Sequence, residues 1–185
     1  MNHQDLSIIC IESYNSIDFE ESNIEVIVRD NVFAFRGTDE PKDVVAPWWV
    51  SELGWVPAGF AKAAKRLIPK CLSECMSRDI EPDKIVLTGH SLGGAVALIV
   101  GALMVRDEIL PKEIVTFGAP KCGRLKLLDG IPVTCYRHGK DIVPMVPPLM
   151  RRHKPLEPAG VPNSFIKDHY MHYYAEMPKL ESLVK

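Results

Sequence analysis

The stretch Lys84-Ile85-Val86-Leu87-Thr88-Gly89-His90-Ser91-Leu92-Gly93-Gly94 carries the strongest fold signal in the chain. Residues 84–88 form a nearly continuous apolar run, which is typical of a strand buried on both faces of a parallel sheet. The apolar residues that begin at Leu92 fit a buried helix. A Gly-x-Ser-x-Gly turn, Gly89 to Gly93, joins strand to helix, and this order predicts an α/β fold.

The flanking sequence continues the alternation of strands and helices. The further predicted elements are strands 24–28 and 32–35, a helix 58–78, a strand 113–117, a short helical stretch 124–128 and a strand 133–137. Only a polar turn separates the first two strands, so they predict an antiparallel hairpin. We therefore expect one domain over residues 1–185, with a mostly parallel central sheet, an N-terminal antiparallel hairpin and flanking helices.

Composition excludes several classes of protein. The chain has 185 residues, with 22 Lys+Arg against 24 Asp+Glu, and the net charge of −2 argues against a strongly basic nucleic-acid binder. The longest apolar run, Gly94 to Val105, is shorter than the roughly 20 residues of a membrane-spanning helix. The first residues lack a basic segment followed by an apolar one, so we expect no signal peptide and a cytoplasmic location. Five scattered cysteines fit a reducing compartment.

Ser91 is the candidate nucleophile. A serine on a sharp turn between strand and helix has a strained backbone, and side chains two positions away on either side would collide with that turn. Glycine at positions 89 and 93 removes this collision. The helix that follows directs its first N–H groups at a developing oxyanion, and the Leu92 N–H is the first such donor.

A serine hydroxyl becomes an effective nucleophile when a histidine takes its proton and an acid orients that histidine. In this fold class the acid precedes the histidine along the chain. Asp141 follows the predicted strand 133–137, at the sheet edge where α/β enzymes place functional groups. Asp129 is the competing acid, but it precedes that strand. Asp141 is therefore the better candidate.

Four histidines follow Ser91. His138 precedes Asp141 and fails the chain order, and His153 lies among basic neighbours that oppose its protonation. His169 and His172 remain, and the residues alone leave both open as the base.

Four blocks of sequence resemble the class 3 lipases, a fungal-lipase-like branch of the α/β-hydrolases. The blocks are Val32–Thr38, Gly89–Gly94, Thr116–Pro120 and Asp141–Pro144 followed by Pro147. With the Asp168-His169 pair they span residues 32–169. This chain is short for that family, so we expect a trimmed sheet.

The resemblance implies a serine carboxylic ester hydrolase, a lipase or another esterase, which works through an acyl-enzyme and needs no cofactor. It implies Asp141 as the acid of a Ser-His-Asp triad with Ser91, and it favours His169 over His172 as the base. It also implies Thr38 as the second oxyanion-hole residue beside Leu92. The expected partner is a small-molecule or lipid ester, with transient contact to a lipid interface.

Two segments could shape a substrate pocket. The three tryptophans, which include Trp49, lie between Pro41 and Pro57, where members of the family carry a lid. Core packing explains them equally well. Met145 and Val146 follow Asp141 in a proline-bounded loop that could line an acyl-chain groove.

The sequence leaves alternatives to ester hydrolysis open. A non-catalytic protein on the same scaffold is one, and transfer of the acyl group to an alcohol is another.

Cys71 and Cys75 lack the ligand pairs of a structural zinc site, so we assign no metal. The basic cluster Arg151–Lys154 could contact a phosphate or an anionic surface, although such clusters are more often solvated loops.

Overall fold

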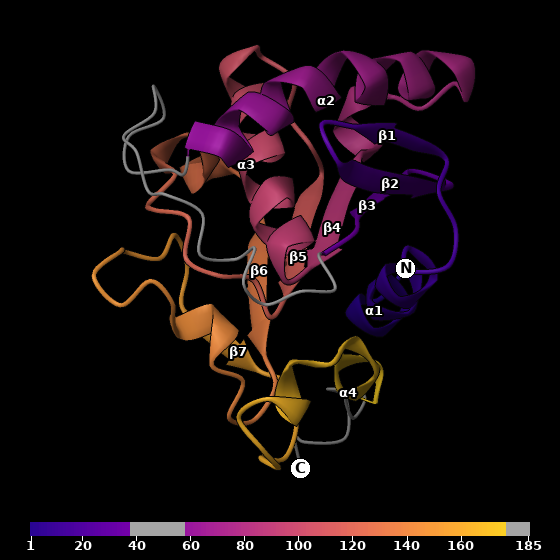
Figure 1. The fold of residues 1–185 in the computed structure, drawn as a ribbon. Helices are drawn as coiled ribbons and strands as arrows, with labels where there is room; N and C mark the ends of the chain where they lie inside the picture. The colour runs from indigo at the N-terminus through magenta and orange to yellow at the C-terminus, as the bar shows by residue number, and fades with distance from the viewer. Residues whose placement is uncertain (38–57, 177–185) are drawn as a thin grey trace, which may run out of the picture.

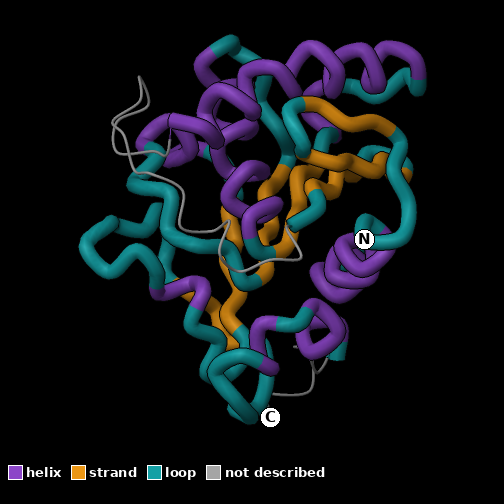
Figure 2. Tube along the Cα trace, viewed as in Figure 1, coloured by secondary structure: helices purple, strands orange, loops and turns teal. Residues whose placement is uncertain are grey.

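The computed structural model describes residues 1–37 and 58–176, which form one sheet with helices on both faces (Figures 1 and 2). The strands are β1 (Phe19–Glu21), β2 (Ile24–Arg29), β3 (Val32–Phe35), β4 (Val86–His90), β5 (Glu113–Phe117), β6 (Val133–Arg137) and β7 (Leu156–Pro158). The α-helices are α1 (His3–Glu12), α2 (Ala58–Ser77), α3 (Leu92–Arg106) and α4 (Met171–Ala175). Short 3-10 turns are η2 (Pro82–Lys84), η3 (Lys126–Gly130), η4 (Val143–Met145) and η5 (Lys167–His169).

The seven strands are arranged in the sheet in the same order as in the chain. β1, β2 and β3 pair antiparallel, and β3 to β7 pair parallel. Phe35 at the end of β3 pairs with Gly89, and His90 at the end of β4 pairs with Phe117. The carboxyl ends of the parallel strands therefore meet at one edge. The predicted fold class, with its hairpin and mostly parallel sheet, is confirmed.

Each face of the sheet has its own apolar core. Helices α2 and α3 cover one face and α1 and α4 the other, as Figure 1 shows. Alternate residues of β2 supply the two cores, because successive strand side chains point to opposite faces: Val26 and Val28 contact the first core and Ile27 the second. Every residue of α3 from Leu92 to Met104 is buried. No helix within the described ranges is long and apolar enough to cross a membrane.

The predicted elements lie within a few residues of the observed ones, and the differences have local causes. β4 begins at Val86, not Lys84, because the proline turn η2 occupies the preceding residues. The helical stretch predicted at 124–128 is the turn η3, which begins two residues later. Sequence patterns missed β1, β7, α4 and α1. The first three have only three to five residues, too few for a period to repeat, and α1 has no clear apolar stripe.

Gly93 packs against the backbone of β3. A Cβ atom at Gly93 would lie 2.0 Å from the Phe35 carbonyl oxygen. At Gly89 it would lie 2.5 Å from the Gly93 carbonyl carbon. Both obstructing atoms are main chain, so neither can move away as a flexible side chain could. The two glycines thus allow β3, β4 and the start of α3 to approach one another.

We predict that Gly93→Ala lowers the free energy of unfolding by about 1–3 kcal/mol, because the new methyl group forces β3 away from α3. Gly130→Ala is the matched control, since a Cβ there meets nothing within 4 Å. Urea denaturation of the three proteins measures the effect. Equal stabilities for the two variants would contradict the close approach at Gly93.

Candidate active site

Ser91 occupies the sharp turn between β4 and α3. Its φ of 53° and ψ of −127° lie in a region that residues other than glycine rarely adopt. The Ser91 N–H donates to the Phe117 carbonyl at 2.9 Å, and the Ser91 carbonyl accepts from the Gly94 N–H at 3.1 Å. These two bonds hold the strained conformation. Leu92 begins α3, so its N–H has no acceptor within the helix and is available beside Ser91.

His169 connects Ser91 to Asp141. Its Nε2 lies 2.9 Å from Ser91 Oγ, and its Nδ1 lies 2.8 Å from Asp141 Oδ2. An ionised carboxylate only accepts hydrogen bonds, so Nδ1–H donates to Asp141 and leaves Nε2 free to accept the Ser91 proton. His169 is the residue that the structure brings to both partners.

Asp141 is fully buried in the loop after β6, and donors surround its carboxylate. Oδ1 accepts the Val143 N–H at 2.9 Å, and Oδ2 accepts the Tyr174 hydroxyl at 2.6 Å in addition to His169. Burial, followed by the negative charge of Asp141, raises the pKa of Tyr174 well above its usual value, so Tyr174 stays a hydrogen-bond donor. Three hydrogen bonds therefore hold the carboxylate in position.

His90 forms a hydrogen bond with the main chain of His169. Its Nε2 lies 2.7 Å from the His169 carbonyl oxygen and its Nδ1 lies 2.7 Å from the Tyr14 hydroxyl. Burial, with a smaller contribution from the nearby His169, lowers the pKa of His90 to about 3, so the ring is neutral. A carbonyl can only accept, so Nε2–H donates to it and Nδ1 accepts from Tyr14. The two imidazole rings lie 4.7 Å apart between centroids.

Asp168 stabilises the turn η5, which contains His169. Its buried carboxylate accepts hydrogen bonds from the backbone N–H groups of Lys140, Asn163 and Ser164. Burial alone would raise the pKa of Asp168, but these three donors outweigh it and lower the pKa. Asp168 therefore remains charged and joins η5 to the loop after β6.

His172, the alternative base, lies on α4 with an exposed side chain. Its ring packs against Tyr173 at 4.1 Å between centroids. Ser91 and Asp141 both contact His169 and not His172. The distances therefore favour His169.

An apolar cleft of about 490 Å³ opens over Ser91 and His169. Its apolar lining residues are Ile11, Ile142, Val143, Phe165, Ile166 and Met171. Phe165 and Ile166 are 60% and 71% exposed, which is unusual for side chains of this size. The cleft therefore offers an accessible apolar surface next to the Ser91 hydroxyl.

The prediction for the residues that line the substrate pocket needs a correction. Met145 and Val146 do not line this cleft; Ile142 and Val143 do, while Met145 lines a second hollow. The turn η4 explains the change, because its three residues per turn carry Met145 away from the side that Val143 faces. Thr38 and Trp49 lie outside the described residues.

Sequence reasoning missed Tyr14 and Tyr174, the hydroxyl partners of His90 and Asp141. Tyr14 lies in the turn after α1 and Tyr174 on α4, and both pack against the same face of the sheet. The motifs around Ser91 and Asp141 contain no signal for a partner so far away in sequence. His90 itself lies inside the Gly-x-Ser-x-Gly motif, where only its position beside Ser91 could have indicated a role.

Comparison with known proteins places the chain among lipases. The profile of the family Lipase (class 3) matches residues 32–150, a segment that includes Ser91 and Asp141. A chloroplastic phospholipase A1 of Arabidopsis thaliana is 36% identical over 103 residues, which is 48% of this chain and 16% of that protein. A lipase of Rhizopus niveus is 42% identical over 74 residues, which is 35% of this chain and 19% of that protein. The chain thus spans less than a quarter of the length of these curated relatives.

Solved structures show the same fold. A lipase of Rhizopus microsporus var. chinensis superposes with a TM-score of 0.56 at 25% identity, covering 76% of this chain and 57% of that one. A Yarrowia lipolytica lipase gives a TM-score of 0.63 at 20% identity, covering 84% of this chain and 78% of that one. Because the family profile matches more than half of the residues, the chain belongs to the class 3 lipase family of the α/β-hydrolases.

Proposed function

We propose that this protein hydrolyses carboxylic esters, with Ser91 as the nucleophile, His169 as the general base and acid, and Asp141 as the residue that orients His169. The observation that carries the proposal is the continuous hydrogen-bonded path from Ser91 Oγ through both nitrogens of His169 to the buried carboxylate of Asp141. This path is the arrangement that activates a serine hydroxyl.

The reaction follows from these positions. Ser91 Oγ attacks the ester carbonyl carbon while His169 Nε2 takes the hydroxyl proton. The tetrahedral intermediate collapses when the same nitrogen returns that proton to the leaving alcohol, and an acyl-Ser91 ester remains. Water then repeats both steps with His169 as base, which releases the acid and restores Ser91. Asp141 stays ionised and stabilises the His169 imidazolium in each half-reaction.

The oxyanion needs donors beside Ser91, and we assign the Leu92 N–H as the first. The family resemblance supports Thr38 as the second. Gly37, the residue before Thr38, lies close to Ser91: a Cβ atom placed on Gly37 would be 3.1 Å from Ser91 Cβ. The same Cβ would lie 2.7 Å from the Tyr14 hydroxyl oxygen and 2.8 Å from the His90 carbonyl oxygen, so a larger residue at position 37 would push this segment away from Ser91.

We propose a lipid ester as the substrate. The apolar cleft of about 490 Å³ over Ser91 suits an acyl chain, and its exposed Phe165 and Ile166 suit contact with a lipid interface. Relatives that are named lipase and phospholipase A1 support the same class of substrate. Hydrolysis of p-nitrophenyl esters from acetate to palmitate measures the chain-length preference.

We predict that Ser91→Ala and His169→Gln each lower kcat for p-nitrophenyl butyrate by about 10⁴-fold or more, because each removes one end of the proton transfer. His172→Gln is the matched control: His172 also lines the cleft, but the hydrogen bonds to Ser91 and Asp141 are made by His169, so this change should alter kcat less than about 3-fold. Steady-state kinetics on the purified variants, with circular dichroism to verify folding, provides the measurement.

Turnover that survives in folded Ser91→Ala would refute the mechanism. Loss of activity in His172→Gln with retention in His169→Gln would move the base to His172. Serine-dependent consumption of ester that yields a new ester when an alcohol is added would identify acyl transfer in place of hydrolysis.

Tyr174→Phe tests how Asp141 is held. We predict a kcat lower by about 3- to 10-fold with an unchanged KM, because loss of the hydroxyl removes one hydrogen bond from the carboxylate that orients His169. Tyr173→Phe is the control, since within the described residues the Tyr173 hydroxyl accepts only a 3.4 Å hydrogen bond from the Asn163 side chain. Equal kcat values for the two variants would show that Tyr174 does not position Asp141.

His90 makes folding stability depend on pH. The unfolded chain takes up a proton on His90 near its usual pKa of 6.5, whereas the folded protein does so only near about 3. The unfolded state therefore binds more protons between these values, and stability falls as the pH is lowered through this window, by up to about 1.4 kcal/mol per pH unit.

We predict that His90→Gln has a shallower loss of stability between pH 6.5 and 4 than the wild type, measured by urea denaturation at several pH values. His172→Gln makes the same chemical change at an exposed site and should keep the wild-type slope. A wild-type slope in His90→Gln would show that His90 is not held neutral.

A further inference from the structure

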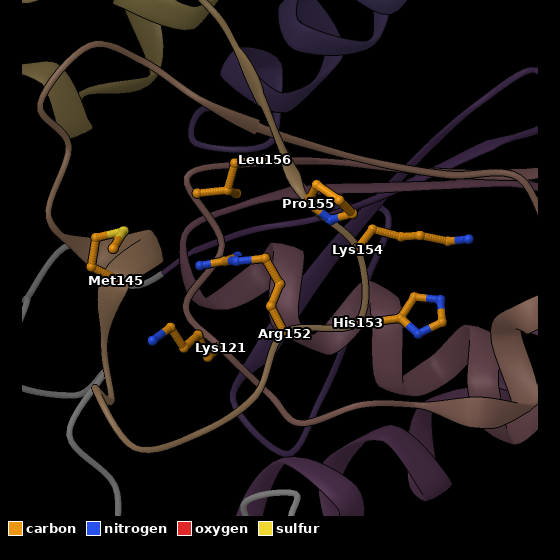
Figure 3. A pocket seen from close by; sticks show the side chains of 7 residues that line it. All are labelled: Lys121, Met145, Arg152, His153, Lys154, Pro155 and Leu156. Carbon is orange, nitrogen blue, oxygen red and sulfur yellow. The ribbon is translucent and has the colours of Figure 1, made fainter.

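A second hollow lies beside the start of β7, lined by the loop that leads into this strand, by the end of η4 and by the segment after β5 (Figure 3). Its volume is about 410 Å³. Its lining residues are Lys121, Met145, Arg152, His153, Lys154, Pro155 and Leu156. It shares no lining residue with the cleft over Ser91. The turn η4 separates the two, because Val143 lines the cleft and Met145 lines the hollow.

The hollow is cationic. Lys121, Arg152 and Lys154 line it, and among residues 1–37 and 58–176 no carboxylate does. Figure 3 shows the charged ends of Lys121 and Arg152 extending to the same side of the loop, with Lys154 and His153 extending to the other. The Lys121 ammonium donates to the Pro148 carbonyl at 3.2 Å, which leaves two of its three N–H groups for another acceptor.

Arg152 lacks a counter-ion within the described part of the chain. Its Nη2 is buried and has no hydrogen-bond partner there. The neighbouring thiols do not compensate its charge, since burial raises the pKa of Cys122 to about 12 and raises that of Cys135, so both are neutral. Burial, with a smaller repulsion from Arg137, lowers the pKa of Arg152 itself. Arg152 is half-buried, and a guanidinium with one buried N–H group that lacks an acceptor is unfavourable, so a nearby anion would offset this cost.

We propose that this hollow binds a phosphate group, held by Arg152 and Lys121 and attracted by the added charge of Lys154. Arg152 and Lys121 extend to the same side, Lys154 adds charge from the other side of the loop, and the described lining holds no carboxylate, so a dianion suits the hollow better than a single carboxylate does. The guanidinium fork matches two phosphate oxygens, and the Lys121 ammonium supplies donors from a second segment of chain. The phosphate belongs either to a small soluble ester or to the headgroup of an anionic phospholipid.

Isothermal titration with inorganic phosphate at constant ionic strength tests the site directly. We expect Arg152→Gln and Lys121→Gln each to weaken binding by about tenfold or more, because each removes a charge-assisted hydrogen bond. Arg151→Gln is the matched control, since Arg151 is exposed, adjacent and absent from the lining, and its removal should change affinity less than about 2-fold. Two variants on separate segments keep the test decisive if one of them folds poorly.

The two sources of phosphate are separated by sedimentation with phosphatidylcholine vesicles, with and without phosphatidic acid. A headgroup site predicts that Arg152→Gln binds the acidic vesicles less than Arg151→Gln does. A site for a soluble ester predicts equal sedimentation of the two variants and competition between glycerol phosphate and inorganic phosphate.

Wild-type protein that does not bind phosphate would overturn the proposal, as would equal affinities in Arg151→Gln, Arg152→Gln and Lys121→Gln. Ester hydrolysis by the same variants serves as a folding control, because none of these residues contacts the cleft over Ser91. Phosphate binding is measured without turnover, so the outcome is independent of the proposed esterase activity.

Discussion

The strained backbone at Ser91 is the constraint on which the rest of the site depends. Its conformation is unfavourable for an isolated residue, so the surrounding sheet must maintain it. The neighbouring strands do so. On one side, the Phe117 carbonyl at the end of β5 accepts a hydrogen bond from the Ser91 N–H, and on the other, β3 lies so close that position 93 has no space for a side chain. The same pairing brings the end of β6, and with it Asp141, to the edge where Ser91 lies. The parallel strand pairing therefore both holds the Ser91 backbone and brings Asp141 to the same edge of the sheet.

Three buried groups around the site have shifted pKa values. Backbone N–H donors lower the pKa of Asp168 against the effect of burial, and Tyr174 remains a hydrogen-bond donor because burial and the Asp141 carboxylate raise its pKa. His90 remains neutral because it is fully buried beside His169. A second cation 4.7 Å from a His169 imidazolium would oppose its formation. The neutral ring holds His169 in place without that repulsion.

Sequence alone predicted the parts of the fold and site that depend on local pattern. Residues 84–94 contain a whole strand, the turn and the start of a helix, so their order was sufficient to predict the α/β fold and the position of Ser91. Asp141 could be placed because it lies in the short loop after a strand, four residues beyond Arg137. Tyr14 and Tyr174 could not, because their contacts with His90 and Asp141 join residues 76 and 33 positions apart. The choice between His169 and His172 likewise depends on how η5 and α4 pack on the sheet.

The segment from Asp141 to Met145 explains how two hollows of opposite character can lie close together. Asp141 accepts the Val143 N–H, which anchors the start of η4 at the Ser91 cleft. The end of the turn is anchored on the other side, where the Val146 carbonyl accepts the Lys121 N–H at 2.8 Å. A hydrogen bond therefore holds each end of the turn, and the same three residues separate the apolar cleft, lined by Val143, from the cationic hollow, lined by Met145.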